Sequence, residues 1–314
     1  IIFKMHYIEK VRQSMLVVKI DQFSYGKKLI FKDIHMEVPS SKIIGLVAPN
    51  GTGKSTLVRI ISGHITGSGI EVNYHGKSYQ KDKQYMRQQI VKMPDQADLY
   101  DELTGLQHLE FYAAMWGVDV TYPQEIVTVL NMGTYIHKKV GTYSLGMRQR
   151  LCFALVVVTQ ASYMLLDEVM NGLDPDNVEM ISSLLKDLRA QGKTMLIASH
   201  LLDNLDSIAD SIYFIKDGHF SVVYHPQEQA LETVLLSFSS KNAVQEFLAL
   251  KPHFTCVNNE ECQATIQLDE LGESLSDFLD WASRNLDDVR EIKVGRKGSY
   301  LIYKELYGTE EEGG

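Results

Sequence analysis

The chain has 314 residues, of which 45% are hydrophobic, and its 31 basic and 40 acidic side chains give a formal net charge of −9. That length can bury one large core and a smaller one, whereas the acidic balance argues against a broad nucleic-acid-binding surface, which is normally basic. No apolar run approaches the roughly 20 residues that span a bilayer, so any membrane-spanning component must be another chain.

The N-terminal part of the sequence predicts an extension followed by a β-hairpin. Residues 1–14 fit no fold element, and they can be an upstream extension, an artefact or a short helix. A strand-like run begins directly after Met15. Turn-forming residues at 25–28 then separate two β-like runs within 21–38, which predicts an antiparallel β subdomain.

A glycine-rich segment, residues 48–56, follows the strand-like run 43–47 and precedes a helix-like run. Backbone amides of such a loop can cradle phosphate oxygens at a helix N-terminus, where the helix dipole favours anions. Lys54 can reach the β- and γ-phosphates, and the Ser55 hydroxyl can ligate Mg²⁺. Ala48 stands where a first glycine is usual, which is a mild deviation. The segment predicts an ATP site formed by Asn50, Gly51, Thr52, Gly53, Lys54, Ser55 and Thr56.

The rest of the chain predicts a helical insertion, a parallel sheet and a further small domain. Within 101–160, apolar residues recur at spacings of two to four, which is typical of one helical face. From 161 to 223, apolar strands alternate with helical runs, which indicates a parallel sheet with crossover helices. Beyond 225, strands are expected at 235–238, 254–257 and 264–268, and helices at 243–250 and 275–284.

Two carboxylates, Asp167 and Glu168, end a strand-like apolar run, at the edge where ligands of open α/β sheets gather. Asp167 can hold Mg²⁺ beside Ser55, and Glu168 is placed to orient or deprotonate an attacking water. His200 ends the next apolar run, where an imidazole can hydrogen-bond a γ-phosphate. The alternative is an acidic pair capping a strand at the surface, which the four apolar residues before Asp167 disfavour.

Several motifs in one order complete the pattern. They read Tyr143-Ser-Leu-Gly-Met-Arg-Gln-Arg150, Tyr163-Met-Leu-Leu-Asp-Glu168, Asn171-Gly-Leu-Asp174 and Met195-Leu-Ile-Ala-Ser-His200. Over residues 16–224 this order resembles the ATP-binding cassette, the nucleotide-binding subunit of ABC transporters. The resemblance implies an α/β P-loop NTPase fold with a mixed or parallel sheet core, an antiparallel β subdomain and a helical subdomain at about 96–160. This domain would span 15–224, and an accessory α/β domain would span 225–314.

The resemblance also implies roles for residues near the nucleotide. Glu168 corresponds to the catalytic base of the family, and His200 to its γ-phosphate sensor. Tyr25 stands where the family stacks an aromatic ring on adenine, although an ordinary buried tyrosine is the alternative. The family places a glutamine or an acidic residue directly after the proline at position 94, so both Asp95 and Gln96 are candidates for that contact.

The signature motif implies a second chain. Ser144 is expected to cap a helix, and Gly146 to let a backbone amide face an anion. In the family these positions contact the ATP bound to the opposite subunit, so a homodimer or a heterodimer with a similar cassette is implied. Asp174, the last residue of the motif 171–174, is likewise expected to contribute to nucleotide binding.

We therefore predict an ATP-binding and ATP-hydrolysing subunit that uses ATP and Mg²⁺ and powers a separate transmembrane permease subunit. The signature form resembles an exporter branch, so export is favoured by analogy, and a groove near 95–115 would pass motion to the permease. Three cysteines without metal-ligand or redox spacing fit a reducing cytoplasm, although Cys256 and Cys262 could pair. The chain is expected at the inner face of the cell membrane, held by the permease, with no nucleic-acid partner.

Two other classes remain as alternatives. A soluble cassette ATPase of DNA repair or translation usually carries two cassettes, coiled coils or zinc hooks, none of which this sequence contains. A regulatory module that binds ATP without turnover is disfavoured by the complete set of Lys54, Asp167, Glu168 and His200. Co-purification with a hydrophobic partner separates the transporter from the first alternative, and phosphate release separates it from the second.

Overall fold

The computed structural model describes residues 15–227, 233–250, 263–267, 283–285, 287–295 and 298–308. The chain divides into two compact units. The first holds the described residues up to Tyr224 together with those from Leu306 onward, and the second spans His225–Glu305. Four expectations fall wholly or largely outside the described residues: the N-terminal extension, the strand at 254–257, the helix at 275–284 and a Cys256–Cys262 pair.

The first unit opens with an antiparallel sheet in the order β2-β1-β4-β5. Its strands are β1 (Leu16–Tyr25), β2 (Lys28–Val38), β4 (Ile70–Tyr74) and β5 (Lys77–Ser78). Strands β1 and β2 pair in antiparallel register up to Tyr25 and Lys28. Gly26 makes the turn with a φ of 58°, in the left-handed region that glycine enters without a Cβ clash. The antiparallel β subdomain is therefore confirmed.

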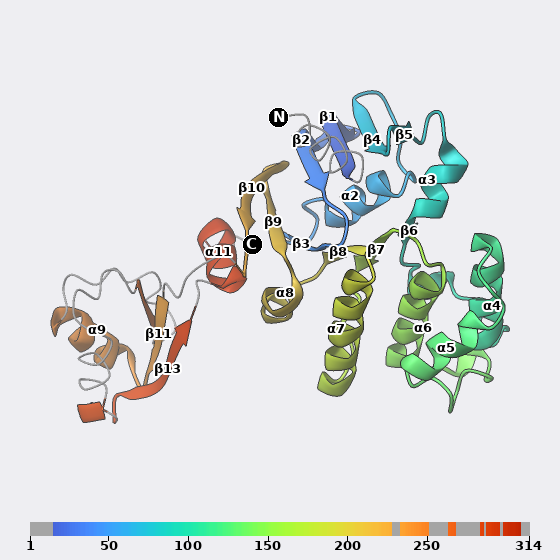
Figure 1. Ribbon diagram of the computed structural model, residues 1–314. Coiled ribbons are helices and arrows are strands. Elements are labelled where there is room, and N and C mark those ends of the chain that lie inside the picture. The colour runs from blue at the N-terminus through green and yellow to red at the C-terminus, as the bar shows by residue number, and fades with distance from the viewer. Residues whose placement is uncertain are drawn as a thin grey trace, which may run out of the picture. The chain divides into compact units, whose positions relative to one another are not determined.

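A six-stranded sheet in the order β10-β9-β3-β8-β7-β6 forms the centre of the first unit (Figure 1). The strands are β3 (Ile43–Val47), β6 (Ile90–Lys92), β7 (Tyr163–Asp167), β8 (Thr194–Ala198), β9 (Ser211–Lys216) and β10 (His219–Tyr224). Strands β9, β3, β8, β7 and β6 run parallel, and β10 adds an antiparallel edge to β9. Every residue of β3 and β8 is buried, as expected for a parallel sheet covered on both faces.

Helices carry the chain between these strands and cover them. They are α2 (Lys54–Ile61), α3 (Lys83–Gln89), α7 (Pro175–Ala190) and α8 (Leu202–Ile208). Helix α2 contacts β4 of the antiparallel sheet as well as β6 and β7 of the central sheet. Its residues Leu57, Val58, Ile60 and Ile61 are fully buried in one apolar core shared by both sheets. The helix that follows the glycine-rich segment 48–56 is therefore fixed by burial on two sides.

The expected helical insertion is present as α4 (Gly105–Trp116), α5 (Tyr122–Val129) and α6 (Leu145–Val158). These three helices contact one another and lie together in Figure 1. The Thr104 hydroxyl caps α4 by accepting a hydrogen bond from the Gln107 amide, and the Gln107 side-chain oxygen accepts one from the Thr104 amide, so both helix-end donors are satisfied. Among the described residues, no helix combines the length and apolarity that crossing a bilayer demands.

The second unit contains a three-stranded antiparallel sheet in the order β12-β11-β13. Its elements are β11 (Thr233–Phe238), α9 (Lys241–Leu250), β12 (Gln263–Gln267), β13 (Val289–Gly295) and most of α11 (Ser299–Tyr307). At the end of α11 the chain rejoins the first unit. The buried Tyr307 hydroxyl donates to the Ile215 carbonyl at 2.8 Å, and Lys216 Nζ donates to the Leu306 carbonyl at 2.5 Å. The accessory domain expected at 225–314 thus differs from the second unit, which ends at Glu305.

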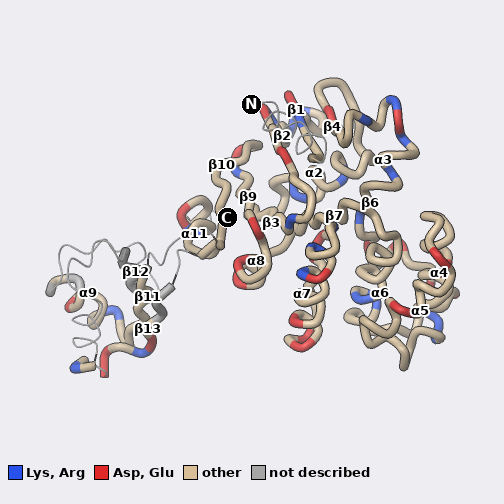
Figure 2. The backbone as a smooth tube through the Cα atoms, in the orientation of Figure 1, with Lys and Arg blue, Asp and Glu red and all other residues tan. Residues whose placement is uncertain are grey.

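Charged side chains are distributed over both units. Figure 2 shows basic and acidic residues scattered along a described chain that is mostly uncharged. Helix α7 carries both signs, whereas the charged residues of α8 are Asp203 and Asp206. The excess of 40 acidic over 31 basic residues is thus spread over many elements.

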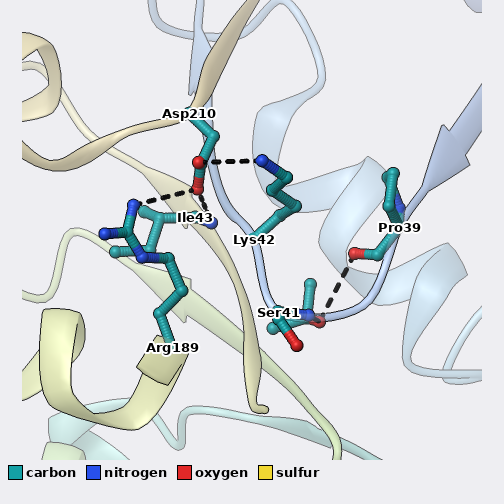
Figure 3. Close-up of polar contacts among 7 residues, drawn as sticks. Pro39, Ser41, Lys42, Ile43, Arg189 and Asp210 are labelled. Atoms are coloured by element: carbon teal, nitrogen blue, oxygen red, sulfur yellow. Dashed lines mark hydrogen bonds and ion pairs between the residues drawn. The ribbon is translucent and has the colours of Figure 1, made fainter. Parts of the chain in front are cut away.

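Asp210 fixes the strand that leads into the glycine-rich segment 48–56 (Figure 3). Its carboxylate accepts from the Ile43 amide at 2.9 Å, pairs with Lys42 at 3.0 Å and pairs with Arg189 at 3.3 Å. Burial raises the pKa of Asp210, but the hydrogen bonds from Ile43 and Lys42 and the charges of Lys42 and Arg189 outweigh it, so the pKa lies below its ordinary value. These contacts join the start of β3 to the start of β9 and the end of α7.

We expect Asp210→Ala to lower the free energy of unfolding by about 1–3 kcal/mol at neutral pH, because it leaves the Ile43 amide without its acceptor. Since the folded-state pKa is depressed, the contribution is complete above the unfolded pKa of about 4 and is lost as the pH falls through the folded pKa. Urea unfolding at stepped pH measures the gap between variant and wild type. Glu179→Ala, an exposed acidic change on α7, serves as the control. A gap that persists unchanged at acidic pH would contradict this assignment.

Candidate functional site

The loop between β3 and α2 depends on two glycines with positive φ. Gly51 has a φ of 76° and Gly53 a φ of 115°. A Cβ on Gly53 would lie 2.7 Å from Ile30 Cγ2 and 2.8 Å from Phe31 Cζ, so any other residue would have to displace these buried side chains as well as adopt a left-handed backbone. Ala48, by contrast, is buried and is not among the residues with positive φ. An alanine at that position therefore costs the loop no backbone strain.

Lys54 begins α2 and turns its amine back over the loop. Nζ donates to the Ala48 carbonyl at 2.5 Å and to the Pro49 carbonyl at 3.3 Å. Burial lowers the pKa of Lys54, and the nearby charges of Glu168 and Asp167 act in the opposite direction. Thr52 braces the same loop, because its hydroxyl donates to the Pro49 carbonyl at 2.7 Å. A buried amine beside carboxylates is suited to hold a phosphate group.

A pocket of about 660 Å³ opens beside this loop. The predicted site residues that line it are Tyr25, Asn50, Gly51, Gly53, Lys54, Ser55, Thr56, Asp95, Gln96, Asp167 and Glu168. The predicted residues that are not part of its lining are Thr52, Ser144, Gly146, Asp174 and His200. Sequence reasoning missed Lys28, Gln149 and Asn171, which also line it. The available signal was their place in the sequence patterns, because Lys28 lies within the predicted turn 25–28, and Gln149 and Asn171 lie within the motifs 143–150 and 171–174.

The two carboxylates lie where β7 ends, and a histidine from the next strand joins them. The Glu168 amide donates to the Ala198 carbonyl of β8 at 2.9 Å, and His200 Nε2 lies 3.0 Å from Glu168 Oε1. Burial raises the pKa of Glu168, although the charges of His200 and Lys54 oppose this and that of Asp167 adds to it. A carboxylate with a raised pKa in a cleft is a candidate proton acceptor.

The segment after Pro94 distinguishes Asp95 from Gln96. Asp95 caps the short 3-10 turn η1 (Gln96–Asp98), and its carboxylate pairs with Lys92 at 3.3 Å. Gln96 Nε2 instead donates to Gln149 Oε1 at 2.6 Å, and Gln149 Nε2 donates to the Glu168 carbonyl at 2.7 Å. Both candidates line the pocket, but hydrogen bonds join the Gln96 side chain to the backbone beside the carboxylates.

The signature residues begin α6 at the surface of the same unit. The Ser144 hydroxyl accepts from the Met147 amide at 3.3 Å, so Ser144 is the expected N-cap. Leu145 is 65% exposed and lines the pocket. Asp174 caps α7 by accepting from the Asn177 amide at 2.9 Å. Tyr25, 49% exposed, lies edge-on to Phe23 with ring centroids 5.0 Å apart.

The chain matches known proteins over the part that contains this pocket. The model of the ABC transporter family matches residues 31–171. The lantibiotic transport ATP-binding protein SrtF of Streptococcus pyogenes is 29% identical over 204 residues, which cover 65% of this chain and 88% of that protein. The ABC transporter ATP-binding protein YhcH of Bacillus subtilis is 31% identical over 207 residues, which cover 65% of this chain and 68% of that protein.

Two further comparisons agree with these. A fluoroquinolones export ATP-binding protein of Mycobacterium tuberculosis is 28% identical over 197 residues, which cover 63% of this chain and 65% of that protein. The solved structure of an ATP-binding subunit of an ABC transporter superposes with a TM-score of 0.63 at 22% identity, covering 67% of this chain and 90% of that one. That structure supports the fold alone. The chain therefore belongs to the ABC transporter family, as an ATP-binding and ATP-hydrolysing subunit.

Proposed function

We propose that the chain hydrolyses ATP for an exporter and that Lys54, Glu168 and His200 carry the chemistry. One observation supports this above all: the phosphate-binding loop, the carboxylates after β7 and the segment after Pro94 line one pocket, with His200 in contact with Glu168. Lys54 would neutralise phosphate charge, and Glu168 would take the proton of the attacking water. His200 would hold the Glu168 carboxylate in place and face the γ-phosphate.

The residues of the pocket fit a Mg²⁺ ion that arrives with ATP. The Ser55 hydroxyl and the Asp167 carboxylate line the pocket, and both are oxygen ligands of the kind that Mg²⁺ prefers. Among the described residues, Glu168 Oε2 is a buried atom without a hydrogen-bond partner, so a donor from within the pocket is needed to satisfy it. Bound Mg²⁺ would stabilise the charge that develops on the phosphates.

Two nucleotide contacts follow from the same lining. Tyr25 would stack on adenine, since its ring is half exposed at the pocket edge. Gln96 rather than Asp95 would approach the attacking water, because the Asp95 carboxylate pairs with Lys92, whereas the Gln96 side chain is joined through Gln149 to the Glu168 backbone.

The signature motif would complete a second copy's site. Ser144 and Leu145 are exposed at the start of α6, where helix amides favour an anion. A Cβ on Gly146 would meet only Leu173 Cδ2 at 3.6 Å and the Gly172 carbonyl at 3.7 Å, which is ordinary contact. Packing within one chain therefore gives no reason for glycine at 146, whereas close approach of a partner's phosphate would give one. Two copies, or this chain and a similar cassette, would thus enclose two ATP molecules.

A separate membrane subunit would dock on the face formed by α3 and α4. A hollow of about 430 Å³ lies there, lined by Lys83, Gln84, Arg87, Gln88, Met115 and Trp116. Met115 is 58% exposed and Phe111 on the same helix is 55% exposed. The groove expected at 95–115 thus shares Met115 with this hollow, and α3 supplies its other wall. Through such a partner the chain would be held at the membrane.

Export is the direction that the relatives favour. One matched protein is named for fluoroquinolone export and another for lantibiotic transport, and the signature Tyr143-Ser-Leu-Gly-Met-Arg148 has the form that suggested an exporter. Co-expression with the membrane protein encoded beside this chain, followed by an export assay in vesicles, tests the proposal. Uptake instead of export, or no association with any membrane protein, would refute it.

We expect Met115→Glu to abolish co-purification with the membrane subunit while ATP affinity stays within about twofold of wild type. The reason is that the variant places an ionised side chain within the proposed contact with the membrane subunit but leaves the nucleotide pocket untouched. Affinity capture from detergent extracts measures the first effect, and nucleotide titration the second. Val129→Glu, a comparable exposed position on α5, is the matched control. If both variants co-purify equally well, the hollow is not the docking site.

A further inference from the structure

One buried glutamine joins three separate parts of the catalytic unit. Gln149 lies on α6 and is only 5% exposed. Its Nε2 donates to the Glu168 carbonyl at 2.7 Å, and its Oε1 accepts from Gln96 Nε2 at 2.6 Å. The side chain thus connects the signature helix to the end of β7 and to the segment after Pro94. A buried amide with both ends satisfied is a rigid connection, because breaking either bond leaves a polar group without a partner.

The orientation of this connection is dictated by its partners. A backbone carbonyl can only accept, so Gln149 must turn its amide nitrogen toward Glu168 and its oxygen toward Gln96. Gln96 must in turn donate, which directs its side-chain nitrogen to Gln149. Neither glutamine can be inverted without losing a bond. The network therefore fixes the Gln96 side chain at the wall of the pocket that it lines.

The backbone that Gln149 holds is strained. Glu168 has a φ of 53°, in the left-handed region that residues with a Cβ rarely occupy. Three hydrogen bonds hold it there: its amide donates to Ala198, and its carbonyl accepts from the Gln149 side chain and from the Asn171 amide at 3.0 Å. Such strain persists only where the surroundings impose it. Of these three bonds, only the one from Gln149 comes from a side chain, and it comes from the helical insertion.

We propose that Gln149 is a positioning residue for ATP hydrolysis, which couples the position of the signature helix to the Glu168 carboxylate and to Gln96. The proposal rests on the assignment of Glu168 as proton acceptor. When α6 is in place, Gln149 holds the Glu168 backbone in the conformation that brings Oε1 to His200. When α6 moves, the same bond pulls on the catalytic carboxylate. Positioning of this kind affects turnover and not the binding of ATP, because the Gln149 hydrogen bonds reach Gln96 and Glu168 but not Lys54 or the phosphate-binding loop.

The test uses Gln149→Met, which keeps an unbranched side chain of similar length and removes both hydrogen bonds. We expect kcat to fall about 10- to 100-fold, the loss that small misplacements of a catalytic group produce, with KM for ATP within about twofold of wild type. Gln149→Glu keeps the acceptor for Gln96 but loses the donor to Glu168, so kcat should fall here as well. Adding Gln96→Ala to Gln149→Met should cost less than the product of the two single effects, since they share one network.

Thr159→Val is the matched control, because Thr159 is a buried polar residue just beyond the other end of α6, and within the described part of the chain its hydroxyl bonds to the Val156 carbonyl and the Ala161 amide, not to the catalytic residues. It should leave kcat unchanged. ATP turnover of the wild type and its loss in Glu168→Gln are measured first. If either is not observed, the proposed function fails, and that failure is distinct from a failure of the role inferred for Gln149. With those established, wild-type kcat in both Gln149 variants, or a parallel loss of kcat and ATP affinity, or an equal loss in Thr159→Val, would overturn the inference.

Discussion

Lys54→Ala should abolish ATP turnover and weaken ATP binding by about 10- to 100-fold, the equivalent of one charge-assisted hydrogen bond of about 1.5–3 kcal/mol. The Lys54 amine lies inside the pocket beside the phosphate-binding loop, where it is buried and interacts electrostatically with the carboxylates Glu168 and Asp167. The fold should survive, because the hydrogen bonds that the amine makes to described residues go to the Ala48 and Pro49 carbonyls of the loop itself.

Titration with a fluorescent ATP analogue measures the affinity, and phosphate release measures the turnover. Lys27→Ala is the control, since Lys27 lies in the nearby β1–β2 turn but not in the pocket lining, and both quantities should stay at wild-type values. Unchanged affinity and normal phosphate release in Lys54→Ala would refute the role of residues 48–56 as the phosphate-binding loop.

Glu168→Gln should leave ATP binding in place and slow the chemical step by about 10²- to 10⁴-fold, the usual contribution of an acid–base group. The amide keeps the shape of the side chain and can still meet His200, which lies 3.0 Å from Glu168 Oε1, but it cannot take a proton. Lys54, Ser55 and Asp167 are untouched. ATP that binds but is not cleaved should then hold two chains together, so the variant should be a dimer with ATP and Mg²⁺ and a monomer without them.

Adding Ser144→Arg to Glu168→Gln should abolish this ATP-dependent dimer. Ser144 is exposed at the N-terminus of α6, where a bulky side chain would stand between the helix and the partner's phosphate. Light scattering of the single and double variants, with and without ATP, measures the association. A double variant that still dimerises with ATP would show that the signature motif does not act across an interface. A single variant that is dimeric without ATP would place the dimer contact elsewhere.

Local sequence patterns were sufficient to predict the phosphate-binding loop and the strands around it. Gly53 must be glycine because a Cβ there would lie against Ile30 and Phe31, and the β1–β2 hairpin follows from its turn residues. Apolar runs of five residues between helical patterns predicted the parallel strands, since both faces of such a sheet are buried. No such pattern predicted that Leu306 and Tyr307 contact β9 of the first unit. Contacts between segments far apart in the sequence produce no periodicity in either segment.

By itself, the sequence determined which chemical groups stand at the ends of β3, β7 and β8, because parallel strands place their C-terminal ends along one edge. Glu168 and His200 are brought within 3.0 Å of each other in this way. Only the tertiary structure decided what surrounds them. Gln149 stands within the motif 143–150, but nothing in that motif indicated its partners, which depend on the packing of α6 against β7 and η1. Hydrogen bonds between residues 19 and 53 positions apart are set by that packing and by no local pattern.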